Sequence, residues 1–214
     1  MEDSMKIAVI GANGHTGRIV VKDALARGHQ VVAVARTDQV SEPDDHNLTN
    51  ARADVRDAGA LMHALVGTDA VISALGVGAS RTGTDVYSTG VSNTLAAMKS
   101  NGVARLAVIS AVPAGPSDEL PILQRRIAVP LLQCIFGFYD DMRRMEAILG
   151  EATEVDWISL RPPRLVNRRP RGTYRIATHP LPKGRAITYG DLATALLDSL
   201  ERQDLYRHAA YVAN

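Results

Sequence analysis

The sequence predicts an α/β fold built on a doubly wound parallel sheet. The first observation behind this is a short apolar run, Lys6 to Ile10, that leads into glycines at positions 11, 14 and 17 and then into a helical segment. The second is the alternation that follows, in which nearly continuous apolar strands are separated by amphipathic helices. Strands of that kind are buried on both faces, which is typical of a parallel sheet between two helical layers.

The first half of the chain supplies the regular part of this pattern. A helix is expected over 15–27, ending at Gly28, and a buried strand over 30–35. A polar loop over 37–50 leads to a short strand that ends before Asp54. The remaining elements expected in this half are a helix over 58–65, a strand over 69–75, a helix that ends at Asn101-Gly102 and a strand over 105–110.

The second half is less regular. Prolines and glycines over 111–121 predict a loop. The elements expected after it are a helix over 138–149, a strand over 155–160, short strands near 174–177 and 209–212, and a helix over 191–200. We therefore expect one domain over 1–214, in which about 160–190 forms a small C-terminal lobe on the substrate side.

The composition limits the functional class. Of the 214 residues, 46% are hydrophobic and 22% are charged, and 24 Lys+Arg nearly balance 23 Asp+Glu, which argues against a nucleic-acid or membrane partner. Cys134 is the only cysteine and the six histidines lack metal-ligand spacing, so neither a disulfide nor a metal site is expected. Without a signal peptide or an apolar span, the expected location is the cytoplasm. The oligomeric state is left open.

The glycine turn predicts a site for a dinucleotide. Gly11 lets the chain turn off the strand, Gly14 lets the backbone approach phosphates, and Gly17 lets the helix pack closely. Free N–H groups and the positive end of the helix dipole then meet the pyrophosphate. The turn residues expected to contact the cofactor also include Asn13, His15 and Thr16. The spacing G-x-x-G-x-x-G favours the short-chain dehydrogenase/reductase superfamily.

The end of the second strand predicts which cofactor is bound. NAD-preferring proteins of this kind place an Asp or Glu there to bind the ribose 2′-OH, whereas this chain has Arg36, with Arg18 just after the third glycine. A guanidinium binds a 2′-phosphate well, so NADP(H) is the expected cofactor. The alternative is that Arg36 is a solvated residue and Asp38 binds the ribose. Further residues expected along the cofactor are Asp54, Val55, Ala74, Leu75 and Gly76.

Several stretches resemble one family in particular. They are GANGHTG at 11–17, VAVAR at 32–36, ADV at 53–55, DAVISALG at 69–76, GVSNTLAAMKSNGV at 90–103, LAVISA at 106–111, DDMRRMEAILGE at 140–151 and RPP at 161–163. In this order they resemble the atypical short-chain reductases of the NAD(P)H-binding, NmrA-like group, above all the biliverdin-IXβ reductase/flavin reductase family. The resemblance implies a single Rossmann domain that reduces flavins, biliverdins or quinones with NADPH.

The resemblance also implies catalytic residues. Ser110 ends the fifth strand, where the superfamily has its catalytic Ser or Thr beside the nicotinamide; the alternative is a serine that satisfies backbone groups. The superfamily signature Y-x-x-x-K uses the tyrosine as proton donor and the lysine to lower its pKa. This chain has Tyr139 and Arg143 on one helix face, and an arginine supplies charge without relaying a proton. Alternatively, Tyr139 packs against the lobe.

The substrate end contains one clear departure from that family. Where the family has Pro-Pro-His, this chain has Pro162-Pro163-Arg164, and an arginine binds an anion but does not titrate near neutrality. Biliverdin is therefore a weaker candidate than flavin. Arg81 and Tyr87 are also expected to line the substrate cleft. A basic cluster follows the sixth strand, and either binds an anionic substrate or is a solvated loop: Arg161, Arg164, Arg168, Arg169, Arg171 and Arg175.

These observations predict an NADPH-dependent oxidoreductase that transfers hydride to a planar conjugated acceptor, a flavin or a quinone, with Ser110 and Arg164 at the acceptor. An alternative of another class is an NmrA-like protein that senses NADP(H) without catalysis, which the altered Y-x-x-x-K signature favours. A sugar-nucleotide epimerase is disfavoured, because those enzymes carry a larger C-terminal domain and an intact signature.

Overall fold

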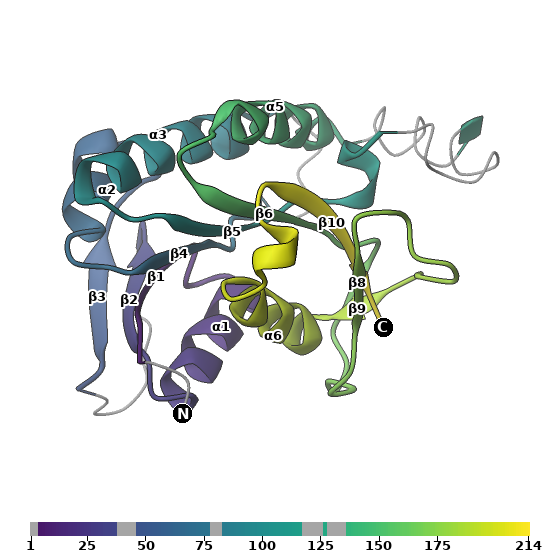
Figure 1. Ribbon diagram of the computed structural model, residues 1–214, viewed down its shortest axis with the longest axis horizontal. Helices are drawn as coiled ribbons and strands as arrows, with labels where there is room; N and C mark the ends of the chain where they lie inside the picture. Colours follow the sequence, from purple (N-terminus) through teal and green to yellow (C-terminus); the bar gives the residue numbers. More distant parts are fainter. Residues whose placement is uncertain (1–3, 38–45, 78–82, 117–125, 128–135) are drawn as a thin grey trace.

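An eight-stranded sheet, in the order β3-β2-β1-β4-β5-β6-β10-β8, lies at the centre of the protein (Figure 1). The computed structural model describes residues 4–37, 46–77, 83–116, 126–127 and 136–214. The strands of this sheet are β1 Lys6–Ile10, β2 Gln30–Ala35, β3 Leu48–Arg52, β4 Ala70–Ser73, β5 Arg105–Ile109, β6 Asp156–Arg161, β8 Arg175–Ala177 and β10 His208–Ala213. Neighbouring strands are parallel except β10 and β8, which pair antiparallel. The predicted doubly wound parallel sheet is confirmed.

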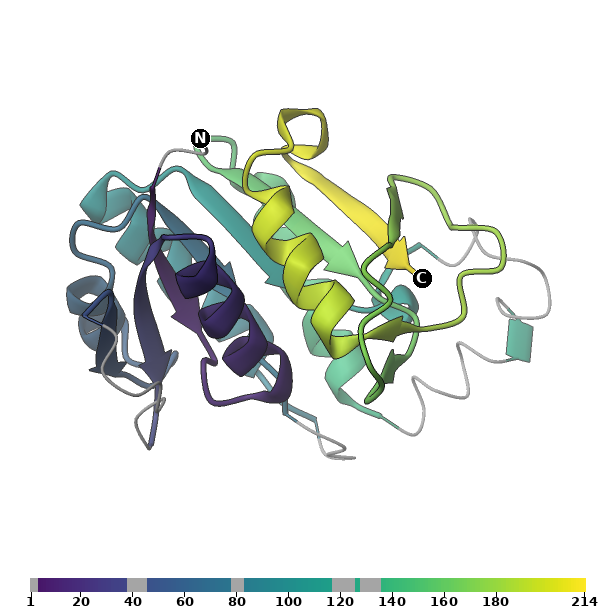
Figure 2. The same cartoon turned by 90° about the horizontal axis from the view of Figure 1, so that it is seen from below.

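Helices cover both faces of the sheet. Figure 1 shows α2, α3 and α5 above it and α1 and α6 below it, and Figure 2 shows α1 and α6 side by side across the lower face. The helices are α1 His15–Ala26, α2 Ala58–Ala64, α3 Val86–Asn101, α5 Phe138–Glu151 and α6 Tyr189–Ser199, with short 3-10 turns η1 Val112–Ala114 and η3 Gln203–Leu205. Within the described ranges, no helix is long and apolar enough to cross a membrane.

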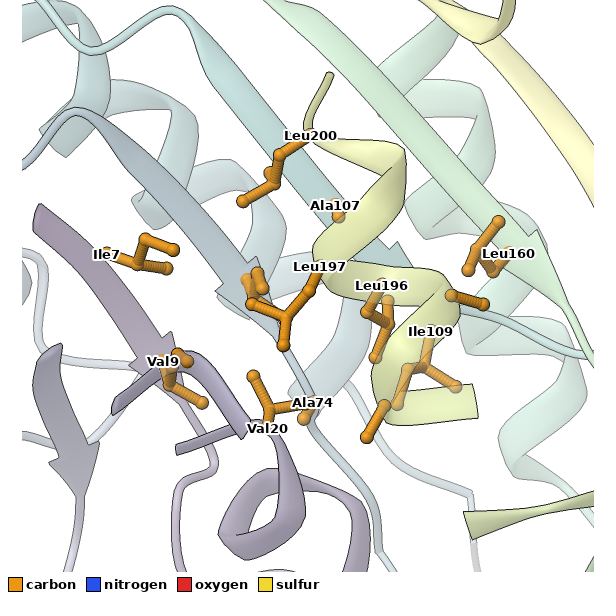
Figure 3. Close-up of a cluster of buried hydrophobic side chains, with 14 of the residues drawn as sticks. Ile7, Val9, Val20, Ala74, Ala107, Ile109, Leu160, Leu196, Leu197 and Leu200 are labelled. Carbon is orange, nitrogen blue, oxygen red and sulfur yellow. The ribbon is translucent and has the colours of Figure 1, made fainter. Parts of the chain in front are cut away.

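Alternate residues of the central strands feed two separate cores. Ile7 and Val9 of β1 pack with α1 and α6, in the cluster that Figure 3 draws around Val20, Leu196 and Leu160. The intervening residues Ala8 and Ile10 pack on the opposite face, with residues of α2, α3 and α5. Because both faces are buried, β1 needs an apolar residue at nearly every position, which explains the unbroken apolar run in the sequence.

The elements expected from the sequence are present, with ends that differ by a few residues. Helix α6 begins at Tyr189 rather than 191, because the Thr188 side chain caps it by accepting the Asp191 N–H at 3.0 Å. Helix α3 ends as expected, with Gly102 in the left-handed conformation at φ 70°. The loop expected over 111–121 falls partly outside the described residues.

The C-terminal part adds a small sheet that the sequence did not predict. Its two strands, β7 Leu165–Val166 and β9 Ile187–Thr188, are parallel and only two residues long. The segment between them is fixed to the start of α6 by Asp191, whose carboxylate accepts N–H bonds from Arg171 at 3.0 Å and Gly172 at 2.9 Å. Thr188 and Asn214 donate to the same carboxylate. A single buried acid therefore holds the segment that follows β6 against the main domain.

Candidate active site

A cavity of about 1120 Å³ runs along the edge of the sheet where the parallel strands end. It is lined by residues at or just after the carboxyl ends of six strands, from Arg36 after β2 to Pro163 after β6. The strand order reverses between β1 and β4, so the glycine turn after β1 lies at the switch point of the sheet. Ligands of doubly wound sheets bind in this crevice.

The glycine turn leaves no space for side chains at two of its positions. Gly11 has φ 78°, and a Cβ there would lie 2.8 Å from the Ala74 carbonyl oxygen. A Cβ on Gly17 would lie 2.2 Å from the Gly11 carbonyl oxygen, so α1 packs directly against the turn. Gly14 is less restricted, with 3.3 Å to the same oxygen. The backbone of the turn therefore needs glycine at positions 11 and 17, as the sequence predicts. The close contact that Gly17 allows is between α1 and the turn itself, rather than between α1 and the strands of the sheet.

The start of α1 faces the cavity without a side-chain cap. Gly14 is the N-cap residue, and the first turn contains no acidic side chain. Gly14, His15 and Thr16 line the cavity. Such a helix end favours an anion, because its N–H groups and its dipole are both uncompensated. The His15 ring stacks on Tyr189 of α6, with ring centroids 5.4 Å apart, and thereby connects the turn to the C-terminal part.

Of the two arginines assigned to the cofactor, only one lines the cavity. Arg36 is exposed at the cavity wall, and its carbonyl accepts a hydrogen bond from Arg52 Nε at 3.2 Å. Arg18 does not line the cavity, and its Nε donates to the Asn13 carbonyl at 3.1 Å, so it stabilises the turn from outside. Asp38, the alternative ribose partner, lies outside the described residues.

The remaining cofactor residues line the cavity in the expected order. Asp54 and Val55 follow β3, and the Asp54 carboxylate accepts the Arg56 N–H at 2.9 Å. Ala74, Leu75 and Gly76 follow β4, where the Ala74 N–H donates to the Ile10 carbonyl at 2.9 Å. Asn13 also lines the cavity, and its side-chain amide donates to the Thr37 carbonyl.

Ser110 lies just after the end of β5 and lines the cavity. The residue is 2% exposed, and its N–H donates to the Leu160 carbonyl at 2.8 Å. Its Oγ is buried and has no hydrogen-bond partner among the residues that the structure describes. The alternative, a hydroxyl that satisfies backbone groups, is thus not seen in the described part of the chain. A buried polar atom without a partner is costly, which makes a ligand group its natural partner.

An aromatic wall faces the cavity near the start of α5, and the sequence predicted its two tyrosines but not its two phenylalanines. We use this name for Tyr87, Phe136, Phe138 and Tyr139, all of which line the cavity. Phe138 contacts Tyr139 at 4.5 Å and Phe136 at 5.6 Å between ring centroids. The whole chain has only two Phe, and both are here. That concentration, in a chain with 4% aromatic residues, is the signal that could have identified the wall.

The expected pair Tyr139 and Arg143 is separated in the structure. Tyr139 lines the cavity and burial raises its pKa, so its hydroxyl stays protonated near neutrality. Arg143 does not line the cavity, and its guanidinium forms an exposed ion pair with Asp140. The guanidinium therefore faces Asp140, one turn back along α5, instead of the cavity.

Tyr87 and Arg164, both assigned to the substrate, line the cavity, whereas Arg81 lies outside the described residues. The Tyr87 hydroxyl accepts the Val77 N–H at 3.2 Å, so its own hydrogen remains available to a ligand. Burial also raises the pKa of Tyr87, which keeps that hydrogen in place.

Asp141, the second residue of the acidic pair that precedes the arginines of α5, has a structural role. It is fully buried, and its carboxylate accepts the N–H groups of Tyr87 at 2.8 Å and Ser88 at 3.4 Å. It therefore caps the start of α3 from another helix, since Asp85, the residue at the N-cap, makes no side-chain cap. This contact positions Tyr87 in the cavity wall.

Arg161, one arginine of the expected basic cluster, lies inside the protein and not at the cavity. Arg161 is buried and forms an ion pair with Glu146 at 2.7 Å, and its guanidinium lies 5.4 Å from the centroid of the Tyr211 ring. Neither alternative given for the cluster, an anionic substrate or a solvated loop, applies to Arg161, because it is buried and its charge is already neutralised inside the protein.

The fold and the cavity together define a dinucleotide-binding protein of the Rossmann type. The chain belongs to the NAD(P)H-binding family, whose model matches residues 11–203. It is 34% identical over 111 residues to 2-alkyl-3-oxoalkanoate reductase of Stenotrophomonas maltophilia, a match that covers 50% of this chain and 33% of that protein. It is 35% identical over 106 residues to an uncharacterized protein of Mycobacterium bovis, covering 50% of this chain and 12% of that protein.

Solved structures share the fold over nearly the whole chain. A proposed NADH-flavin reductase from Streptococcus pneumoniae has a TM-score of 0.81 at 21% identity, covering 99% of this chain and 100% of that one. A short-chain dehydrogenase/reductase from Veillonella parvula, solved with NADP, has a TM-score of 0.79 at 16% identity, covering 99% and 95%. At these identities the likeness extends to the fold alone.

Proposed function

We propose that the protein is an NADPH-dependent reductase that transfers hydride to a planar conjugated acceptor, a flavin or a quinone, with biliverdin a weaker candidate. The observation that carries the proposal is that one cavity is lined by the glycine turn, by the aromatic wall and by Ser110, whose hydroxyl has no partner among the described residues. A flat apolar acceptor packs well against aromatic rings. One of the proteins that share this fold is described as an NADH-flavin reductase, so the fold is compatible with the same acceptor class.

The cavity residues fit a phosphorylated dinucleotide. The glycine turn and the uncapped start of α1 suit the pyrophosphate, and Arg36 suits a 2′-phosphate. When bound there, NADPH supplies the hydride, and a proton must reach the acceptor as well. Ser110, Tyr87 and Tyr139 carry hydroxyl groups that stay protonated near neutrality and can donate to acceptor oxygens or nitrogens. We further propose that the lobe over about 160–190 forms the acceptor side, with Arg164 at its edge.

The test is NADPH oxidation by the purified protein with FMN, FAD, menadione and biliverdin as acceptors. Turnover with flavin or quinone, faster than with biliverdin, is the expected result. An absence of turnover with all four acceptors would refute the acceptor class.

The position of Arg143 outside the cavity favours one rival function, an NADP(H) sensor without catalysis. Calorimetric titration with NADP+ and NADPH distinguishes the two. Tight binding of one redox form over the other, together with no turnover, would favour the sensor. Similar affinities together with turnover would favour the reductase.

A further inference from the structure

A second cavity, lined mainly by cationic side chains, adjoins the first. Its volume is about 570 Å³, and we call it the basic cavity. Four arginines of the expected cluster line it together with two cations from the loop before β9, and the described residues that line it include no Asp or Glu. The cations are Arg164, Arg168, Arg169, Arg171, Lys183 and Arg185.

These charges are not neutralised within the described part of the chain. None of the six forms an ion pair with a described acidic residue, whereas seven other cations of the protein do. The buried Asp191 contacts the backbone of Arg171, but its carboxylate already accepts hydrogen bonds from Arg171 N–H, Gly172 N–H, Thr188 and Asn214. The whole chain carries a net charge of only +1, so this surplus is local. All six side chains are exposed, so water screens their mutual repulsion, but such a concentration of like charge still attracts anions.

The small sheet connects the basic cavity to the candidate active site. In β7, Leu165 lines the first cavity and Val166 the second; in β9 and α6, Thr188 lines the second and Tyr189 the first. Successive residues of a strand face opposite sides, so this sheet forms a wall common to both cavities. Arg164, immediately before β7, lines both of them. The two cavities therefore adjoin at Arg164, and a charged group on an acceptor at that end of the first cavity lies beside the cations of the second.

The basic cavity lies at the acceptor end rather than the cofactor end. Arg36 follows β2, whereas the basic cavity lies beyond β6, which is four strand positions away in the sheet. At about 4.8 Å between neighbouring strands, this separation is about 19 Å. The cationic residues are therefore not an extension of the proposed 2′-phosphate site.

We propose that the basic cavity binds the phosphate-bearing end of the acceptor, and that the acceptor is a flavin nucleotide rather than an uncharged flavin or quinone. This inference rests on the proposed function. Arginine pairs with phosphate through two parallel hydrogen bonds. The six cations of the basic cavity, which form no ion pair with a described acid, therefore favour an anionic group over an uncharged one.

The test compares FMN with riboflavin, which has the same ring system and no phosphate. The variant is Arg168→Gln/Arg185→Gln, and the matched control is Lys22→Gln/Lys99→Gln, which removes the same charge at two positions that line neither cavity. The wild-type protein should bind FMN at least about tenfold more tightly than riboflavin. The double arginine variant should lose that preference, with kcat and the KM for riboflavin within about twofold of wild type, while the control retains it.

Binding and turnover are measured separately, so that the two proposals can fail separately. Flavin binding to the NADP+-loaded protein is followed by quenching of flavin fluorescence, which needs no reaction. A preference for FMN that depends on Arg168 and Arg185, without hydride transfer, would support this inference and refute the proposed function. Reduction of both flavins with equal KM, or binding of neither flavin, would overturn the inference.

Discussion

Replacing Gly17 by Ala tests the geometry on which the cofactor site depends. The added Cβ would lie 2.2 Å from the Gly11 carbonyl oxygen, whereas ordinary van der Waals contact begins at 3.4 Å. The turn cannot easily move away, because Gly11 donates its N–H to the Val34 carbonyl at 3.0 Å and its carbonyl accepts the Gly14 N–H at 3.0 Å. Such overpacking costs about 1–3 kcal/mol, and the helical preference of Ala returns at most about 1 kcal/mol.

The expected result has two parts. Unfolding should occur at a Tm up to about 12 °C lower than wild type, and NADPH should bind about 10- to 100-fold more weakly, because a displaced turn no longer aligns its N–H groups. Fluorescence titration with NADPH and calorimetric unfolding measure these quantities. Gly150→Ala in α5 is the control, since a Cβ there meets nothing within 4 Å and should leave binding unchanged. If Gly17→Ala retains wild-type affinity for NADPH, the glycine turn does not hold the pyrophosphate.

Three further variants address the other parts of the site. Arg36→Ala should raise the KM for NADPH by about 10- to 100-fold and leave that for NADH unchanged; an equal rise for both would point to another partner of the 2′-phosphate. Ser110→Ala should lower kcat by about 10- to 100-fold without lowering Tm, since its hydroxyl has no partner among the described residues, and a loss of Tm instead would indicate a structural role. Asp191→Asn should cost about 1–3 kcal/mol near pH 7. Burial raises the pKa of Asp191, but the hydrogen bonds from Arg171, Thr188, Asn214 and Gly172 outweigh it and hold the pKa below the ordinary 3.8. The stabilisation is therefore present above that pH and lost below it, so the difference in Tm between variant and wild type should shrink as the pH falls below 3.8; a constant difference would contradict this.

The cofactor end could be predicted because it depends on backbone sterics. Only glycine tolerates φ 78° at Gly11 and contact with the turn at Gly17, so the spacing of these residues reveals the turn directly. The central strands could also be predicted from the sequence, because burial on both faces requires an apolar residue at almost every position.

The acceptor end was harder to predict because it depends on contacts between residues distant in sequence. Asp141 caps the start of α3 by accepting the N–H of Tyr87, which lies 54 residues earlier in the sequence. No pattern in the sequence around Asp141 indicates this contact. Arg161 resembles its neighbouring arginines in the sequence, yet Glu146, which neutralises it, lies on α5. The strands β7 and β9 have two residues each, too few for any periodic pattern to indicate a strand.

The two ends of the cavity differ in how much substitution each can tolerate. A substitution at the glycine turn must move backbone that is hydrogen-bonded to β2, so the cofactor end tolerates little variation. The proposed acceptor end consists of side chains on α5, on the segment after β6 and on the loop before β9, none of which the sheet needs for its hydrogen bonds. Arg164, where the resembling flavin-reducing family has His, is such a position. Exchanging it alters the charge shared by the two cavities and leaves the sheet intact, so under the proposed function we expect acceptor preference to change without loss of NAD(P)H binding.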